Sequence, residues 1–205
     1  MLATALGLKF KNGVVLAADR RVSYGTFILS RSARKVFPVN DRVGVAFAGL
    51  PADFQELYDS LIYNIRIYEL DERKKATPAN VARLLSILLY SGRFSRFFLA
   101  EIVVGGLSPD GPQIIAVDAA GGMLEDDFAA EGTGAQLATG ILEREFRKDM
   151  EESEAVELAK RAMIAAIERD ALSGDGIDLV VITEEGVREE FVPVRKPWRA
   201  AELER

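Results

Sequence analysis

The chain contains neither cysteine nor histidine. Their absence excludes disulfide bonds, thiolate zinc sites, cysteine nucleophiles and every mechanism built on a Ser–His or Cys–His pair. Any catalysis must therefore use hydroxyl groups, carboxylates, lysine or a terminal amine. We expect neither a cofactor nor a metal ion.

Long apolar runs and an excess of positive charge are also missing. No stretch approaches the roughly eighteen uninterrupted apolar residues of a membrane span, and the N-terminus has no charged-then-apolar leader. The formal net charge of -6 argues against binding a polyanion, because neutralising phosphates requires clustered Lys and Arg. These features predict a cytoplasmic protein that binds neither membranes nor nucleic acid.

Asparagine and glutamine are scarce. They occur only at Asn12, Asn40, Asn64, Asn80, Gln55, Gln113 and Gln136, whereas charged residues make up 28% of the chain. Few thermolabile side chains together with many charges are typical of proteins from thermophiles.

The chain has 205 residues, of which 49% are apolar, enough for one domain with a well-filled core. Two short apolar runs, residues 5–10 and 14–18, flank Lys11-Asn12-Gly13, and Asn-Gly is a strong signal for a two-residue hairpin. We therefore predict that the chain opens with a β-hairpin, and that Ser30, Asn40 and Asp41 lie in later turns. Further strands are predicted at residues 26–29, 35–39, 43–47, 102–107, 113–117, 123–126, 129–131, 178–183 and 187–192.

Helical spacing of apolar residues begins at Ala52 and returns in residues 135–146 and 156–167. A further helix is predicted to start at Thr77-Pro78, with Thr77 as its N-cap and Pro78 in its first turn. The order of strands, two helices, strands, two helices and strands is typical of an α+β protein. Two sheets packed face to face and covered outside by helix pairs would bury every apolar face.

Several short motifs give a more specific signal because they occur together and in order. The motifs are Gly7-Leu8-Lys9-Phe10-Lys11-Asn12-Gly13-Val14-Val15-Leu16-Ala17-Ala18-Asp19-Arg20-Arg21, Lys35, Ala48-Gly49, Val104-Gly105-Gly106, Asp118-Ala119-Ala120-Gly121-Gly122, Gly132-Thr133-Gly134 and Arg169-Asp170-Ala171-Leu172-Ser173-Gly174-Asp175-Gly176-Ile177-Asp178. Their separations are those found in the β subunits of proteasomes. Over residues 3–192 the chain resembles this family, and the simple archaeal type most closely.

The resemblance implies a four-layer αββα sandwich, the N-terminal-nucleophile hydrolase fold, in a subunit of the 20S core particle. In this family β subunits form heptameric rings stacked between rings of α subunits, and the particle degrades unfolded polypeptides inside the cell. Active members attack the peptide bond with an N-terminal threonine, whose own α-amine accepts the proton with help from a neighbouring lysine.

Three residues of this chain match the catalytic frame of active members near the nucleophile. Asp19 matches the carboxylate that pairs with the active-site lysine, and Lys35 matches that lysine, whose positive charge lowers the pKa of the groups around it. Gly49 matches the glycine whose N–H forms the oxyanion hole. The alternative for the first two is a purely structural ion pair, and Gly49 is equally consistent with an ordinary glycine before a helix.

A second group matches the residues that orient the terminal amine. Asp170 and Ser173, spaced Asp-x-x-Ser, correspond to the orienting pair, Thr133 stands where the family usually has serine, and Arg21 matches a basic residue beside the site. For Asp170 and Ser173 a helix C-terminus followed by a glycine turn is an alternative that is compatible with the catalytic interpretation.

The nucleophile itself departs from the pattern. Counting back from Gly7, the catalytic threonine corresponds to Ala3, and the preceding residue is Leu2 where active members carry glycine. Thr4 comes one position too late, and a shift of one residue in a strand sends the side chain to the opposite face. Thermophilic archaea often carry two β subunits, one of them degenerate in this way.

Two functions remain open at this point. In the first, the chain is a non-catalytic subunit that completes a β ring with α subunits and another, active β subunit. In the second, it is an active threonine endopeptidase, either because Thr4 becomes N-terminal after processing or because Ala3 was engineered to trap an inactive form. In both, residues 1–205 are expected to form one β-type domain, with an N-terminal extension at residues 1–2 and a polar tail at about 193–205.

Overall fold

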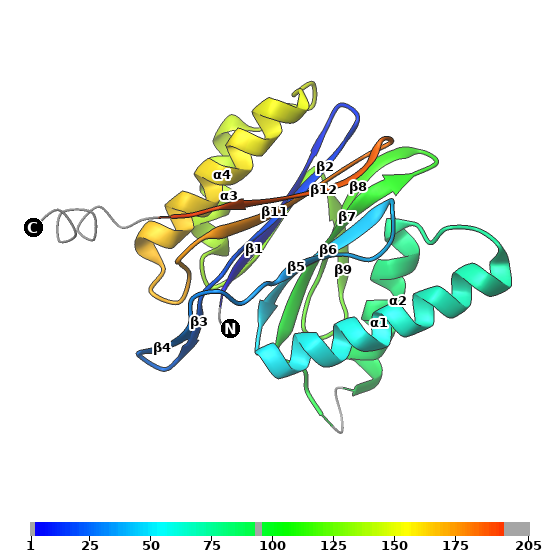
Figure 1. Ribbon diagram of the computed structural model, residues 1–205, viewed down its shortest axis with the longest axis horizontal. Helices are drawn as coiled ribbons and strands as arrows, with labels where there is room; N and C mark the ends of the chain where they lie inside the picture. The colour runs from blue at the N-terminus through cyan, green and yellow to red at the C-terminus, as the bar shows by residue number, and fades with distance from the viewer. Residues whose placement is uncertain (1–2, 93–95, 195–205) are drawn as a thin grey trace, which may run out of the picture.

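The computed structural model describes residues 3–92 and 96–194, and these residues form four layers (Figure 1). Two five-stranded antiparallel sheets face each other at the centre, with a helix pair on each outer side. This confirms the predicted α+β sandwich with its αββα order. The helices are α1 (Pro51–Glu72) and α2 (Pro78–Gly92) on one side, and α3 (Ala135–Glu145) and α4 (Glu152–Arg169) on the other.

The strands divide into the two central sheets and a separate ribbon. In spatial order, the first sheet contains β10 (Phe128–Gly132), β1 (Thr4–Phe10), β2 (Gly13–Asp19), β11 (Ile177–Thr183) and β12 (Gly186–Val192). The second contains β5 (Val36–Pro38), β6 (Val43–Gly49), β7 (Ala100–Ser108), β8 (Gly111–Val117) and β9 (Met123–Asp126). The ribbon consists of β3 (Val22–Tyr24) and β4 (Phe27–Ser30) and projects from one end of the sandwich (Figure 1).

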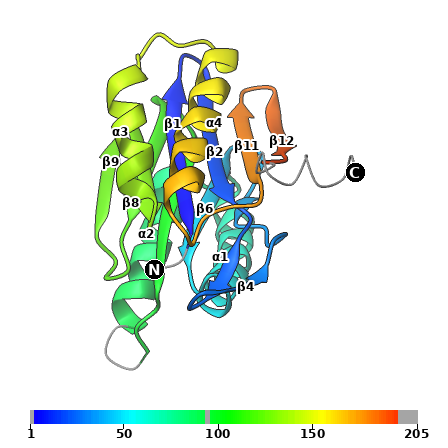
Figure 2. The same cartoon turned by 90° about the vertical axis from the view of Figure 1, so that its left-hand side faces the viewer.

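Three apolar cores hold the layers together. One lies between the first sheet and α3 and α4, of which α4 runs over β1 and β2 in Figure 2. Another lies between the second sheet and α1 and α2. The third lies between the sheets and contains small residues such as Ala5, Ala18 and Ala46. Because β1 and β2 are buried on both faces, they read as nearly continuous apolar runs rather than as alternating ones.

The opening hairpin is confirmed, and its two-residue loop lies one position before the Asn-Gly pair. The loop consists of Lys11 and Asn12, neither of which has a positive φ, and Gly13 already pairs with Phe10 in the ladder. A Cβ atom at Gly13 would lie 2.2 Å from the backbone oxygen of Ile182. The glycine therefore permits close approach of β11 rather than a left-handed turn.

The first helix pair follows the predicted signals closely. Helix α1 begins at Pro51, one residue before the predicted start, and Arg73 ends it in the left-handed conformation. Thr77 caps α2 as predicted, because its Oγ1 accepts a hydrogen bond from the Asn80 N–H (3.3 Å) while Asn80 Oδ1 accepts one from the Thr77 N–H (3.0 Å). Among the described residues, no helix combines the length and apolar character needed to cross a membrane.

The ribbon is where the strand predictions are least accurate. The strand expected at residues 26–29 is β4, which extends to Ser30, so the prediction of a turn at Ser30 is wrong. Strand β3 has only three residues and pairs only with β4, with a bulge between Val22 and Ser23. A strand this short has no alternating pattern that would predict it.

The strand register gathers the candidate site at one end of the sandwich. Thr4 at the start of β1 pairs with Gly132 at the end of β10, and Asp19 at the end of β2 pairs with Ile177 at the start of β11. The segment that follows α4 leads directly into β11. Segments far apart in sequence therefore meet at this end of the first sheet.

Candidate functional site

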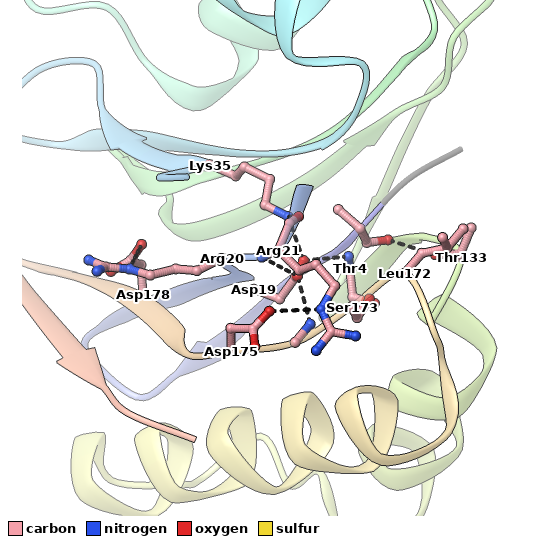
Figure 3. A network of polar contacts seen from close by, with 12 residues as sticks. Thr4, Asp19, Arg20, Arg21, Lys35, Thr133, Leu172, Ser173, Asp175 and Asp178 are labelled. Atoms are coloured by element: carbon pink, nitrogen blue, oxygen red, sulfur yellow. Dashed lines mark hydrogen bonds and ion pairs between the residues drawn. The ribbon is translucent and has the colours of Figure 1, made fainter. Parts of the chain in front are cut away.

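Asp19 is the centre of the site and is fully buried. One carboxylate oxygen accepts hydrogen bonds from the Thr4 N–H (3.0 Å) and from Lys35 Nζ (2.7 Å), and the other accepts from the N–H groups of Arg21 and Gly174, both at 2.9 Å (Figure 3). Four donors from separate parts of the chain thus satisfy a single buried carboxylate. This arrangement keeps a charged group stable in the interior.

Lys35 precedes β5, and its side chain is only 1% exposed. Its Nζ donates to Asp19 and to the backbone oxygen of Arg21, each at 2.7 Å, and its own backbone oxygen accepts from the Phe47 N–H (2.8 Å). Burial lowers the pKa of Lys35, although the Asp19 carboxylate opposes this shift. Nζ and the Thr4 N–H donate to the same Asp19 oxygen, so Asp19 links the lysine to the start of β1.

A second network joins the end of α4 to β1 and to the loop before α3. Asp170 accepts hydrogen bonds through one carboxylate oxygen from Ser173 Oγ (2.6 Å) and from Thr133 Oγ1 (2.5 Å). Ser173 Oγ also lies 2.7 Å from Thr4 Oγ1. An ionised carboxylate only accepts, so the Ser173 proton goes to Asp170 and Thr4 must donate to Ser173. Asp170 therefore orders the hydroxyl groups of Thr133 and Ser173 directly, and that of Thr4 through Ser173.

Ala3 occupies the position of the expected nucleophile and is 1% exposed. Its side chain belongs to the core between the sheets, with Ala5, whereas Thr4 points to the opposite face, as strand alternation predicts. The Ala3 backbone oxygen accepts hydrogen bonds from the N–H (2.9 Å) and Oγ1 (3.3 Å) of Thr133. Its φ of 114° lies in a region that L-residues other than glycine rarely adopt. The site therefore holds a methyl group on a strained backbone where the reacting hydroxyl is expected.

Gly49 ends β6 with a φ of 147°. A Cβ atom at this position would lie 2.0 Å from the backbone oxygen of Leu99. Packing of β6 against β7 therefore requires glycine here, whether or not its N–H faces a substrate. The residue type alone does not distinguish an oxyanion hole from a structural glycine.

Arg21 holds the loop that follows α4 in place. Its guanidinium is 4% exposed, and it donates to Asp175 Oδ2 (2.8 Å) and to the Ala171 backbone oxygen (2.9 Å). Arg31 forms a second ion pair with Asp175. Burial by itself would raise the pKa of Asp175, but the hydrogen bonds and charges of Arg21 and Arg31 outweigh it and lower that pKa. Arg21 therefore supports the segment that carries Ser173 rather than the reacting position itself.

The structure brings together five of the predicted site residues: Asp19, Lys35, Thr133, Asp170 and Ser173 form two hydrogen-bonded networks, joined through Thr4. Gly49 is not part of either network. Sequence reasoning missed the part that Thr4 takes. Strand alternation places Thr4 on the face opposite to Ala3, where the Asp-x-x-Ser turn packs. That alternation is the signal that could have indicated its role. Within the described ranges, no group of three or more acidic side chains is arranged to hold a metal ion.

Comparison with known proteins adds independent information. A family model described as proteasome subunit matches residues 3–182. Proteasome subunit beta 2 of Korarchaeum cryptofilum is 67% identical over 195 residues, which cover 95% of this chain and 98% of that protein. Proteasome subunit beta 2 of Pyrobaculum neutrophilum is 50% identical over 193 residues (94% and 95%), and proteasome subunit beta 1 of Ignicoccus hospitalis is 48% identical over 180 residues (88% and 90%).

Proposed function

The chain belongs to the proteasome subunit family as a β-type subunit of the 20S core, and we propose that it is a non-catalytic member of the β ring. Family membership implies stacked rings with α subunits. The observation that carries the proposal is the methyl group of Ala3, which is buried at the position of the nucleophile. A methyl group has no lone pair with which to attack a carbonyl carbon.

The contacts of Thr4 support the same conclusion against the alternative of an active peptidase. Its hydroxyl is buried, points away from the face of Ala3 and donates its proton to Ser173. Its backbone N–H donates to the Asp19 carboxylate as part of the β1 strand. As a nucleophile, Thr4 would have to leave both networks. The frame around it therefore favours a structural hydroxyl.

We expect the purified chain to be inactive toward fluorogenic peptides and to remain unlabelled by epoxyketone or β-lactone inhibitors. These inhibitors react with the threonine hydroxyl, and the epoxyketone also requires the free amine. The measurement is hydrolysis together with intact-protein mass after incubation, with an active β subunit carrying an N-terminal threonine as the positive control. Labelling at Thr4 would show that the register assigned to the nucleophile is wrong.

The proposal includes a partner, another β subunit that supplies catalysis. Relatives of this chain carry names numbered beta 1 and beta 2, which supports two kinds of β subunit in such particles. The frame is intact and the strands are buried on both faces, so the fold has been retained although the nucleophile has not. A subunit without a role in assembly would have no reason to retain it. A cytoplasmic location, as expected from the sequence, belongs to the same proposal.

We therefore expect the chain to enter a large cylindrical particle when it is mixed with α-type subunits and an active β subunit of the same source. Native mass spectrometry and electron microscopy would measure its incorporation and its stoichiometry in the ring, with mixtures that lack either partner as controls. A chain that stays monomeric under native conditions with both partners present would contradict this prediction.

A further inference from the structure

Two glutamates from different sheets meet at the site end of the layer between the sheets. Glu101 lies in β7 on the face that also carries Val103, and Glu131 lies in β10 on the face that carries Ala129. Both of these apolar neighbours belong to the core between the sheets or pack against it. The two carboxyl groups consequently face each other across this layer, close enough for one to donate a hydrogen bond to the other when it is protonated.

Within the described part of the chain, the surroundings of the pair supply negative charge and no ion-pair partner. Asp118, which follows β8, is the third acidic group near Glu131. Among the ion pairs of the described residues, none includes Glu101, Asp118 or Glu131. The neighbouring strands β1 and β6 place alanines on this face, and Lys9, farther along β1, is paired with Asp127 and Glu125. Two carboxylates in this setting cannot both ionise without repulsion.

Glu101 is connected to the candidate site through the backbone of Gly132 and Thr133. Glu101 Oε2 accepts a hydrogen bond from the Gly132 N–H (3.0 Å). The next residue, Thr133, donates through its N–H to the Ala3 backbone oxygen (2.9 Å) and through its hydroxyl to Asp170 (2.5 Å). A Cβ atom at Gly132 would lie 2.1 Å from the Ala3 oxygen, so this segment fits tightly against β1. A change in the position of Glu101 would therefore act on Thr133, which contacts both Ala3 and Asp170.

We propose that Glu101 and Glu131 share one proton in the folded chain and form a pH-sensitive latch that holds residues 132–134 against the start of β1. Burial, followed by the charges of Glu101 and Asp118, raises the pKa of Glu131 to about 7. Because the folded state keeps a proton that the unfolded chain releases, this contribution to stability is complete at low pH and is lost as the pH rises through 7. The latch does not involve the nucleophile, and its test is independent of whether the subunit has peptidase activity.

Urea unfolding of the full chain between pH 5 and pH 9 tests the latch. We expect Glu131→Gln to remove the loss of stability around pH 7, because the amide does not titrate and still donates a hydrogen bond to Glu101. The variant should therefore exceed the unmodified chain in unfolding midpoint at pH 8 and above. Glu168→Gln, at an exposed position on α4, is the matched control and should follow the unmodified chain throughout.

Two measurements on the unmodified chain complete the test without relying on a variant. The carboxyl carbon of Glu131, observed by NMR, should titrate near pH 7. Hydrogen exchange at the Gly132 and Thr133 amides, corrected for its intrinsic pH dependence, should accelerate about tenfold from pH 6 to pH 8, the factor that corresponds to one pKa unit. A Glu131 that titrates below about pH 5, an unchanged exchange rate, or identical pH profiles for Glu131→Gln and the unmodified chain would overturn the proposal.

Discussion

Replacing Asp19 with asparagine should lower the free energy of unfolding by about 3–5 kcal/mol, because Lys35 would then be a buried charge without its partner. Both side chains are at most 1% exposed, and their charged atoms lie 2.7 Å apart. A domain of this kind is stable by only about 5–15 kcal/mol in total, so the variant should lose a large part of its stability. Urea unfolding followed by circular dichroism measures the change.

An exposed ion pair provides the matched control. Asp41 lies 3.3 Å from Lys75, and more than half of each side chain is exposed. Asp41→Asn should cost less than about 1 kcal/mol, as is usual for surface pairs. Adding Lys35→Met to Asp19→Asn should recover part of the loss because it removes the unpaired charge. Equal losses in Asp19→Asn and Asp41→Asn would mean that the buried pair does not anchor this end of the fold.

The same carboxylate explains why the frame persists in a subunit that we propose to be inactive. Asp19 binds the start of β1, the segment before β5 and the loop after α4 at once. In an active member these contacts would also hold the reacting groups in place. Catalytic and structural roles therefore use the same hydrogen bonds. The presence of Asp19 and Lys35 alone cannot distinguish an active subunit from an inactive one.

Much of the fold could be predicted from local patterns in the sequence. Helical spacing and the Thr77 cap predicted the helices because their apolar faces pack on a sheet. Alternating or continuous apolar runs predicted eleven of the strands in the described residues, all except β3, within a few residues. Gly13 shows the limit of such patterns. The Asn12-Gly13 pair predicted a two-residue turn, whereas the loop is Lys11-Asn12. The glycine is required by Ile182 on a strand about 170 residues away, a contact that no local pattern contains.

The candidate site was predictable only through the family resemblance. Asp19, Lys35 and Asp170 lie on three separate segments, and neither period nor spacing predicts that they meet. Glu101 and Glu131 were missed for a related reason. Each is an ordinary polar residue in its own strand, and their shared burial appears only when the two sheets pack.

An Ala3→Thr variant that is released from a cleavable fusion, with the new threonine as its first residue, should gain peptidase activity once it is assembled. The hydroxyl, the free amine and the frame of Asp19, Lys35, Asp170 and Ser173 would then be present together. We expect a rate at least about 10²-fold above the unmodified chain, the lower range for positioned acid–base groups. Removing the preceding peptide also removes the φ constraint at this residue, where 114° would be especially unfavourable for β-branched threonine.

The partner β subunit in that experiment should lack its own nucleophile, so that turnover and epoxyketone labelling report on residue 3 alone. Ala3→Val released from the same fusion is the matched control, because valine has the shape of threonine without its hydroxyl, and it should remain inactive. Ala3→Thr with Leu2 still attached should also remain inactive, since its amine is part of a peptide bond. The methyl group of Thr133 could displace the amine slightly, and about 1.4 kcal/mol of barrier already costs a factor of ten. A verified N-terminal threonine in an assembled particle with neither turnover nor labelling would therefore mean that the frame no longer positions a nucleophile, and that Asp19 and Lys35 persist for their contribution to stability alone.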